Sequence, residues 1–435
     1  MEKILLNYFF DDLSKAFLAN AAKCTASGEV YKKGDFFKLN MPLTSIYIVN
    51  DPDVLKHVLI DNEPKYEKSR IYWKELRRVI GKAMGSVEGD EWTVLKQIQK
   101  SFFTKSQVER YLEDVRNISN EGVFALPDDQ KINLLAELSA INFRIILKTI
   151  FGIKTTEGKI HTLVKIIEDG EAFIYWRSKY PWRPFFSFFT KNWFQTQKSL
   201  RIFTDWVKTL LDHKYYEKNS LTDILLEKGY SYNHIRNEMI IHLGASTETV
   251  AVAECWTVYL LTQHASWYVK VKQEISAHYN EGNFDPALFP VLTACVKEAM
   301  RLYPPSHAIV RDCVCEQGDT IAGQKIKKGD VMYISAYGIH RNPNFWQEPD
   351  RFNPERFLHN NEKNIETNTY LPFGAGKHAC IGKYLAMPMV ITTLVHLLNR
   401  YTITFDDTVP KEPVSLSTLK SKNGFFVNLI KNQQI

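Results

Sequence analysis

A glycine-rich loop around one cysteine is the segment of the chain best suited to chemistry. It reads FGAGKHACIG over residues 373–382 and precedes an apolar run from Lys383 to Leu398 that is typical of a helix. Glycines let the backbone approach a flat cofactor without Cβ clashes, and a helix N-terminus stabilises the thiolate form of Cys380. A thiolate bound to haem iron favours cleavage of the O–O bond. A buried, inert cysteine in a tight turn is the plainer alternative.

A polar cluster inside a long apolar segment is the second candidate. The segment from Asn233 to about Ala265 is longer than the ~10–14 residues of an average helix and apolar on most faces, which predicts a helix through the core. Its middle reads GASTET over residues 244–249. Either the hydroxyl groups donate to carbonyl oxygens four residues earlier, which is common, or an acid and an alcohol act together in proton transfer.

The chain is predicted to form one domain, residues 1–435, because it contains no internal repeat, low-complexity tract or Gly/Ser linker. Between about Glu91 and Lys228 the apolar residues recur mostly at spacings of three and four, which predicts successive helices. After Arg311 the sequence becomes rich in turns and short strand-like runs. These patterns predict a mainly α fold with a small β-sheet region.

Composition narrows the functional classes. The 435 residues carry 55 Lys+Arg against 49 Asp+Glu, and this net charge of +6 is too mild to indicate nucleic acid as a partner. The six cysteines show no zinc-ligand spacing, which indicates reduced thiols and a cytoplasmic protein. The apolar N-terminal run stops at Asp11 and Asp12, short of the roughly 18 residues of a membrane span, so we expect neither a signal peptide nor a span.

The cysteine loop resembles the haem loop of the cytochrome P450 family, F-x-x-G-x-x-x-C-x-G with a basic residue two positions before the cysteine. The matching residues are Phe373, Gly376, Cys380 and Gly382, with His378 in the basic position. The resemblance implies the cytochrome P450 fold and a haem b cofactor with Cys380 as the axial ligand of iron. It also implies that Phe373, Gly374 and Gly382 lie against the cofactor.

The resemblance extends to the cations that neutralise the haem propionates, which need partners when buried. It implies contacts from His378, from Arg311 after the double proline, and from Trp92 with Lys96, which resemble the family's W-x-x-x-R helix. Lys96 stands where arginine is usual and gives a point charge in place of a planar fork. An ordinary amphipathic helix is the alternative for Trp92 and Lys96.

Two upstream motifs also resemble the family. Glu298 and Arg301, three apart on one helix face, match its E-x-x-R pair, and Arg356 in PERF (354–357) supplies the third member of a buried structural network. Alone, such a pair would more often decorate a solvated surface.

The polar cluster matches the family's A-G-x-[D/E]-T pattern at Ala245, Glu248 and Thr249, with Ser246 in place of glycine. The resemblance implies that Ala245 lies beside the haem. It implies that Glu248 and Thr249 are catalytic residues, which deliver protons to iron-bound dioxygen.

The implied activity is that of a soluble, bacterial-type monooxygenase, which hydroxylates, epoxidises or oxidatively couples a largely apolar organic molecule in secondary metabolism. Because the chain contains no flavin, nicotinamide or iron–sulfur motif, electrons must come from a ferredoxin or flavodoxin with its reductase. Lysines that could dock such a carrier are Lys96, Lys100, Lys105, Lys377 and Lys383. A peroxide-using or redox-neutral haem enzyme and a non-catalytic haem sensor are the alternatives, and the pair Glu248 and Thr249 argues against both.

Family analogy places substrate contacts in the loop before Gly89, the aromatic stretch Phe173–Phe194, the start of the long helix, and the turns Ser306–Val310 and Ser417–Leu419. The aromatic stretch suits an apolar entrance lid. Core packing, or a patch that touches a membrane or a carrier protein, is the alternative.

Overall fold

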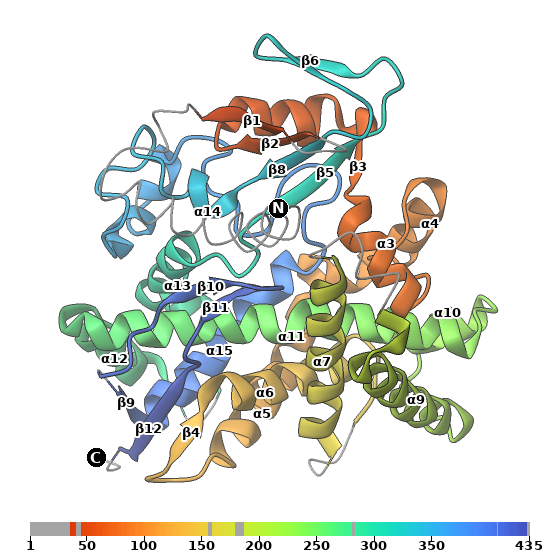
Figure 1. Ribbon diagram of the computed structural model, residues 1–435. Coiled ribbons are helices and arrows are strands. Elements are labelled where there is room, and N and C mark those ends of the chain that lie inside the picture. Colours follow the sequence, from red (N-terminus) through yellow and green to blue (C-terminus); the bar gives the residue numbers. More distant parts are fainter. Residues whose placement is uncertain are drawn as a thin grey trace. The chain divides into compact units, whose positions relative to one another are not determined.

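A computed structural model of the protein describes residues 35–40, 45–154, 159–178, 187–280, 283–406 and 408–432 (Figure 1). The chain divides into two compact units, each assembled from separated stretches of sequence. The first unit comprises Met1–Lys74, Lys297–Ile381 and Pro413–Lys422, and the second comprises Glu75–Val296, Gly382–Glu412 and Asn423–Ile435.

The first unit contains a five-stranded sheet. Its strands, in spatial order, are β1 (Phe36–Asn40), β2 (Ser45–Val49), β8 (Val331–Ile334), β5 (Ile309–Cys313) and β3 (Tyr66–Lys68). β2 and β8 run parallel with Ile46 opposite Val331, and the other neighbours are antiparallel. Side chains alternate between the faces, as the period of a strand requires: Tyr47 and Met332 pack in one cluster, and Ile46 and Val331 in another.

Short helices and two hairpins complete the first unit. The helices are α2 (Pro52–Lys56), η2 (His57–Asp61), η3 (Glu63–Lys65), α14 (Ala336–Ile339), η8 (Pro354–Phe357) and η9 (Asn361–Asn364), and the hairpins are β6 (Asp319–Ile321) with β7 (Gln324–Ile326) and β10 (Pro413–Ser415) with β11 (Leu419–Ser421). Two longer helices, α3 (Arg70–Val79) and α13 (Pro290–Leu302), begin in one unit and end in the other.

The second unit is mostly helical. Its helices are α4 (Gly89–Gln99), η4 (Lys100–Phe103), α5 (Lys105–Phe124), α6 (Leu134–Thr149), α7 (Ile160–Ser178), η6 (Ser187–Phe189), α9 (Lys191–Asp212), α10 (Leu221–Glu227), α11 (Tyr232–Gln263), α12 (Ala265–His278), η7 (Pro286–Leu288) and α15 (Lys383–Arg400). A small antiparallel sheet joins β4 (Lys131–Asn133), β12 (Phe426–Lys431) and β9 (Tyr401–Phe405). The prediction of a mainly α fold with a small sheet region is confirmed.

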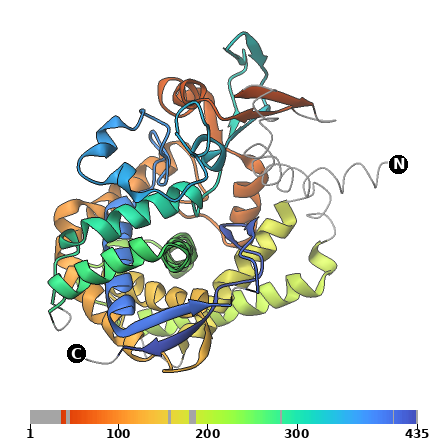
Figure 2. The same ribbon diagram turned by 90° about the vertical axis from the view of Figure 1, so that its left-hand side faces the viewer.

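α11 is the predicted core helix. Figure 2 looks nearly along its axis, with α6 and α15 beside it. Its N-cap is Ser231, whose side chain accepts a hydrogen bond from His234 N. Buried residues recur on all sides from Ile235 to Leu261, as expected for a helix inside a core. In the ranges that the structure describes, no helix is both long and apolar enough to cross a membrane.

A buried acid fixes α11 against α6. Asn142 Nδ2 donates to Glu254 Oε2 at 2.9 Å. Desolvation raises the pKa of Glu254 well above its ordinary value, although hydrogen bonds from Asn142 and Thr393 act in the opposite direction. Burial therefore favours the neutral acid, so this contact positions α11 without the cost of a buried charge.

Candidate functional site

The cysteine loop lies in the first unit and is closed by backbone hydrogen bonds. Cys380 N donates to Phe373 O at 2.8 Å, and Ala379 N donates to Gly376 O at 3.1 Å. Gly374 and Gly376 have φ values of +70° and +71°, which glycine adopts without the strain that a side chain would bring. Cys380 is exposed at the end of this loop.

The loop packs directly on η2 and η3. A Cβ atom on Gly376 would overlap the backbone oxygen of Leu59, so glycine is required for this close approach. Glu63 Oε1 lies 3.5 Å from both Lys377 Nζ and His378 Nε2. An acidic side chain thus lies beside His378, the predicted propionate partner.

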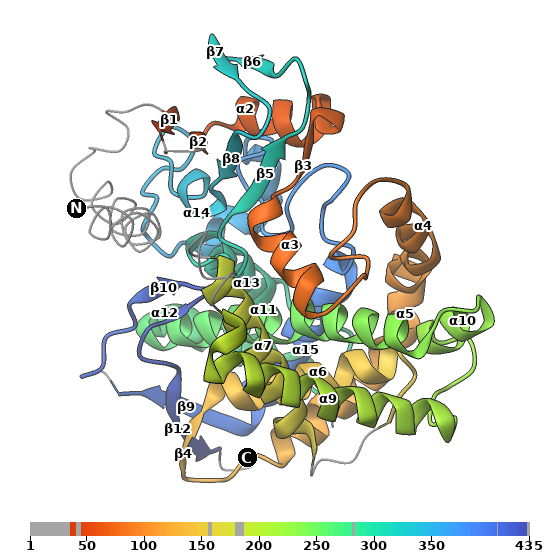
Figure 3. The same cartoon turned by 45° about the vertical axis from the view of Figure 1, so that its right-hand side comes forward.

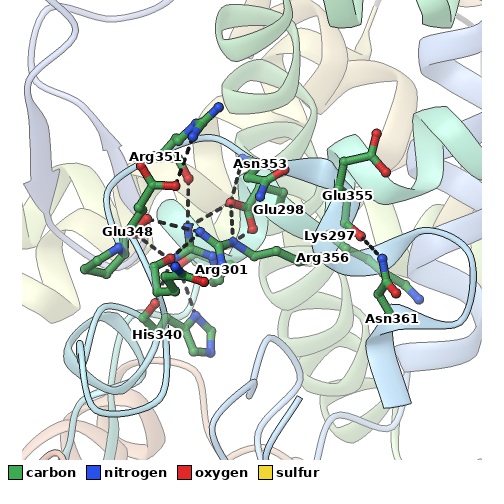
Figure 4. Close-up of polar contacts among 12 residues, drawn as sticks. Lys297, Glu298, Arg301, His340, Glu348, Arg351, Asn353, Glu355, Arg356 and Asn361 are labelled. Atoms are coloured by element: carbon green, nitrogen blue, oxygen red, sulfur yellow. Dashed lines mark hydrogen bonds and ion pairs between the residues drawn. The ribbon is translucent and has the colours of Figure 1, made fainter. Parts of the chain in front are cut away.

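Glu298 and Arg301 on α13 form a fully buried pair (Figure 4). Arg301 Nε donates to Glu298 Oε2 at 2.7 Å, and Arg301 Nη2 donates to Oε1 at 2.8 Å. Arg301 Nη1 donates to the backbone oxygens of His340 and Pro349, both at 2.7 Å. Asn353 N donates to Glu298 Oε1 at 2.9 Å. Such extensive hydrogen bonding is what a buried charge pair needs to be tolerated.

Arg356 in η8 is the third member of this network. Its Nε donates to Glu298 Oε1 at 3.4 Å, and its Nη2 donates to two backbone oxygens at 2.6 and 3.1 Å (Figure 4). The guanidinium carbons of Arg301 and Arg356 lie 4.9 and 5.9 Å from the ring centre of Trp346. The network therefore fastens α13 to the segment 346–357.

His340 links the network to the cysteine loop, and sequence reasoning missed it. Leu371 N, near the start of the loop, donates to His340 Nε2 at 2.7 Å, and Nδ1 lies 3.1 Å from Arg301 O. Because Nε2 accepts, Nδ1 must be the protonated nitrogen that donates. Burial lowers the pKa of His340 to about 3, which keeps the ring neutral. A single histidine in HRNP (340–343) carries no spacing signal for this role.

Each of the two turns that family analogy assigns to substrate is bonded to a residue next to the other turn. Leu419 N donates to Pro305 O, just before Ser306–Val310, at 3.1 Å, and His307 Nε2 is hydrogen bonded to Ser415 Oγ, two residues before Ser417–Leu419. Burial lowers the pKa of His307 to about 4, so its ring is neutral near pH 7. Arg311, on β5 beyond the first turn, is 8% exposed, and its Nη1 donates to the backbone oxygen of Val310 at 3.0 Å.

The polar cluster of α11 divides between two faces of the helix. Thr249 Oγ1 donates to Ala245 O at 2.7 Å, and Ser246 Oγ donates to the carbonyl four residues earlier at 2.6 Å. Ala245 is exposed and Ser246 and Thr249 are half-buried, which is unusual in a helix that is buried elsewhere. Thr247 and Glu248 lie on the other side, each 4% exposed.

Trp92 and Lys96 come together on α4. Trp92 is buried in a small cluster with Val87 and Leu95, and Lys96 Nζ lies 4.6 Å from the centre of the Trp92 ring. α4 starts at Gly89, whose φ of +64° suits glycine. The pair combines apolar packing with an amino group held at the ring face.

The aromatic stretch is divided between core and surface. Phe173 on α7 is 3% exposed and lies 6.0 Å from the ring of Trp193, so core packing accounts for it. Phe188, Phe189 and Phe194 are 46%, 84% and 65% exposed. A lid or a contact surface stays a prediction for these three. Phe185 and Phe186, in the same stretch, lie outside the described residues.

The predicted site residues fall in both units. The first contains Phe373, Gly374, His378, Cys380, Arg311, Glu298, Arg301 and Arg356, and the second contains Trp92, Lys96, Ala245, Glu248, Thr249 and Gly382. Among the described residues, no group of three or more His, Cys, Asp or Glu side chains is arranged to hold a metal ion. A single exposed cysteine fits haem iron, because the porphyrin brings its own ligands and needs only an axial side chain. The exposed Ala245 fits a helix face that a flat group covers.

Comparison with known proteins gives the family. The family model for cytochrome P450 matches residues 23–428. Human cytochrome P450 4Z1 is 26% identical over 89% of this chain and 82% of its own length, and the pig taurochenodeoxycholic 6 alpha-hydroxylase is 25% identical over 89% and 82%. The LUTEIN DEFICIENT 5, chloroplastic protein of Arabidopsis thaliana is 25% identical over 88% and 69%. Since the family match extends over most of the sequence, the chain belongs to the cytochrome P450 family of haem-dependent monooxygenases.

Proposed function

We propose that the chain binds haem b through the thiolate of Cys380 and oxidises a largely apolar organic molecule by hydroxylation, epoxidation or oxidative coupling. The observation that carries this proposal is the exposed Cys380 at the end of a glycine loop, just before α15. The reduced carbon monoxide spectrum of the purified protein tests it, because a thiolate ligand should give a strongly red-shifted Soret band. A band typical of histidine ligation would contradict the proposal.

The residues around Cys380 have distinct tasks in this proposal. The residues that would bind the propionates are His378, Arg311, Lys96 and Trp92, and the residues that would lie against the flat ring are Phe373, Gly374, Gly382 and Ala245. When bound, the haem supplies the redox chemistry that activates dioxygen. Glu298, Arg301 and Arg356 touch none of the reacting atoms and hold the first unit together.

Glu248 and Thr249 supply protons during dioxygen activation, and replacing Thr249 with alanine tests this. We expect Thr249→Ala to divert electrons to hydrogen peroxide and to lower product formation by on the order of 10- to 100-fold, at or below the usual contribution of a proton-transferring group. Product and peroxide per electron are the measurements. Haem content should stay unchanged, because the substitution removes only the hydroxyl of the half-buried Thr249.

Thr257→Ala is the matched control for this variant. Thr257 Oγ1 donates to Ala253 O at 2.7 Å, so it makes the same bond to the carbonyl four residues earlier on the same helix. It should remain coupled, as should Thr249→Ser, which keeps the hydroxyl. Equal product per electron in Thr249→Ala and the wild type would refute the proton-supply role.

Electrons come from a separate ferredoxin or flavodoxin with its reductase, docked on lysines of the second unit. Lys105 Nζ and Lys383 Nζ lie 5.4 and 4.9 Å from the ring centre of Tyr384, and all three residues are exposed. These residues, the Tyr384 patch, present positive charge around an aromatic ring. Such a patch attracts an acidic carrier and raises its association rate.

Charge reversal tests the Tyr384 patch. Lys105→Glu combined with Lys383→Glu should slow reduction of the protein by an acidic carrier by about tenfold or more at low salt. Raising the ionic strength should shrink the difference, because salt screens exposed charges. Lys208→Glu, which changes another exposed lysine, on α9, is the control. Equal rates for the double variant and this control would exclude the patch.

The proposal also includes a substrate class and a cellular location. The name of the pig relative describes a hydroxylase of an organic molecule, and the exposed phenylalanines at 188, 189 and 194 suit apolar contact. A screen of compounds for the high-spin shift of the haem band would identify ligands. We further propose that residues 1–435 act as one domain, in the cytoplasm and in secondary metabolism.

A further inference from the structure

Two cysteines lie close together at the end of β5 in the first unit. Cys313 is the last residue of β5, and Cys315 follows two positions later, on the way to the hairpin of β6 and β7 (Figure 3). Both are free thiols; Cys313 is fully buried and Cys315 is half-buried. The proposed function uses neither side chain, so the pair is a separate candidate for chemistry.

The backbone keeps the two side chains on one face of the chain. Cys313 N donates to Asp330 O at 2.8 Å, and Val314 N donates to Lys65 O, on the side of β3, at 2.8 Å. This alternation is that of an extended chain, in which side chains two residues apart point to the same face. Cys313 belongs to an apolar cluster, and Cys315 packs against that same cluster. The two sulfur atoms therefore lie on one side of the strand.

A hydrogen bond places the sulfur of Cys313 beside the backbone of Cys315. Burial raises the pKa of the Cys313 thiol, and a hydrogen bond from the backbone of Cys315 acts in the opposite direction. The backbone donor of Cys315 is its N–H group, and its Cβ atom is two bonds from that nitrogen. Because β5 ends at Cys313, no strand pairing restrains Cys315. Rotation of the Cys315 side chain can thus bring the two sulfur atoms together.

A lysine lies within electrostatic reach of both thiols. Lys65 Nζ lies 2.8 Å from Asp319 Oδ1. This hydrogen bond is the main cause of the raised pKa of Lys65, and negative charge on Cys315 and Cys313 raises it further. A cation beside a partly exposed thiol is the setting in which cysteines react with peroxides. A small oxidant from solvent would meet Cys315 first, because Cys313 is buried.

We propose that Cys313 and Cys315 form a reversible disulfide when hydrogen peroxide reaches Cys315. The Cys315 thiolate attacks the peroxide: an S–O bond forms, the O–O bond breaks, and the leaving hydroxide takes up the proton that the thiol had released. The Cys313 thiol then attacks the oxidised sulfur, so that an S–S bond forms, the S–O bond breaks, and the hydroxyl group leaves with the thiol proton as water. Two thiols are oxidised, and one peroxide is reduced to two waters.

The source of the peroxide is the haem enzyme itself, and this part rests on the proposed function. Electrons that activate dioxygen without forming product leave as hydrogen peroxide. Ala375 of the cysteine loop packs against the same cluster as Cys315, so the thiol pair lies close to that loop. The burial of Cys313 suits the second thiol of such a pair, because it meets the oxidised Cys315 more readily than it meets peroxide.

One tryptic peptide reports on the pair. Cleavage after Arg311 and Lys325 releases residues 312–325, which contain both cysteines and no third. In the reduced holoprotein, added hydrogen peroxide should cause this peptide to lose two hydrogen atoms and to resist alkylation, and dithiothreitol should restore both thiols. Cys255 and Cys295, fully buried in the second unit, are internal controls and should stay reduced.

Single replacements separate the two thiols. Cys315→Ser should slow the oxidation of Cys313 by about tenfold or more, because a buried thiol ionises less and is less accessible. Cys313→Ser should leave on Cys315 a sulfenic acid that dimedone captures, followed by a sulfinic acid that dithiothreitol does not reverse. The carbon monoxide spectrum should be the same in both variants. If wild-type protein accumulates sulfinic acid on Cys315 while Cys313 stays reduced, the pairing is wrong.

Turnover tests the source of the oxidant. Thr249→Ala, which should release more peroxide, should form the disulfide faster than the wild type when both are supplied with electrons, and catalase should prevent this. A disulfide that forms with added peroxide but not during peroxide-releasing turnover would overturn the proposed source. If Thr249→Ala releases no extra peroxide, the proposed function is contradicted, whereas added peroxide still decides whether the two cysteines pair.

Discussion

Replacing Cys380 with serine should abolish the red-shifted carbon monoxide band completely. A serine hydroxyl does not ionise near neutral pH and donates far less electron density to iron than a thiolate does. The loop itself should survive, because it is closed by backbone atoms such as Cys380 N and Phe373 O, 2.8 Å apart. The measurement is the reduced carbon monoxide spectrum together with bound haem per protein.

Cys315→Ser is the matched control for this experiment. Cys315 is another partly exposed cysteine of the first unit, and its Sγ contacts Gln317 Oε1 at 3.4 Å. Its replacement should leave the band unaltered. If Cys380→Ser kept the band while Cys315→Ser lost it, the iron ligand would have been assigned to the wrong sulfur.

Glu298→Ala should cost about 3–5 kcal/mol of folding stability, the range for removing one partner of a buried ion pair. The substitution leaves Arg301 fully buried and Arg356 mostly buried without their shared carboxylate. Arg301 also holds the backbone oxygen of His340, and His340 in turn holds Leu371 at the start of the cysteine loop. We therefore expect loss of bound haem together with loss of folded protein, measured by haem content and thermal unfolding.

Arg351→Ala shows how much of the stability lost in Glu298→Ala depends on the burial of the ion pair. Arg351 pairs with Glu348 at the same spacing of three residues, 2.9 Å apart, but both side chains are more than half exposed. Exposed pairs contribute at most about 1 kcal/mol, so this variant should bind haem normally. A stable, haem-replete Glu298→Ala variant would show that the network has no structural role.

The features that the sequence predicted best are those that depend on the local periodicity of apolar and polar residues. The expected helix from Asn233 to about Ala265 is α11, Tyr232–Gln263, because apolar residues on all faces predict a buried helix without knowledge of its neighbours. The strand-like runs after Arg311 correspond to β6, β7 and β8, because turn residues there bound short runs that suit strands. The spacing of Glu298 and Arg301 also predicted their contact, since a helix brings residues three apart onto one face.

Contacts between distant segments could not be predicted in this way. Nothing local in the sequence indicates that Leu371 bonds to His340, or that Glu171 fills the space left by Gly244. For the α11 cluster, the structure shows the bond of Thr249 to an earlier carbonyl oxygen, and proton transfer by an acid and an alcohol stays a prediction. Glu248 is buried on another face of the same helix. Periodicity separates these faces, but it does not reveal which helix covers each one.

The parallel pairing of β2 with β8 has a consequence for synthesis on the ribosome. Ser45 N donates to Asp330 Oδ1 at 3.2 Å across a separation of 285 residues. At about 5–20 residues per second, translation needs roughly 15–60 s to deliver the second strand after the first has emerged. During that time β2 offers unpaired backbone groups and apolar side chains such as Ile46 and Ile48, the kind of edge on which nascent chains aggregate. A lower growth temperature and abundant chaperones should therefore raise the amount of active protein that a cell yields.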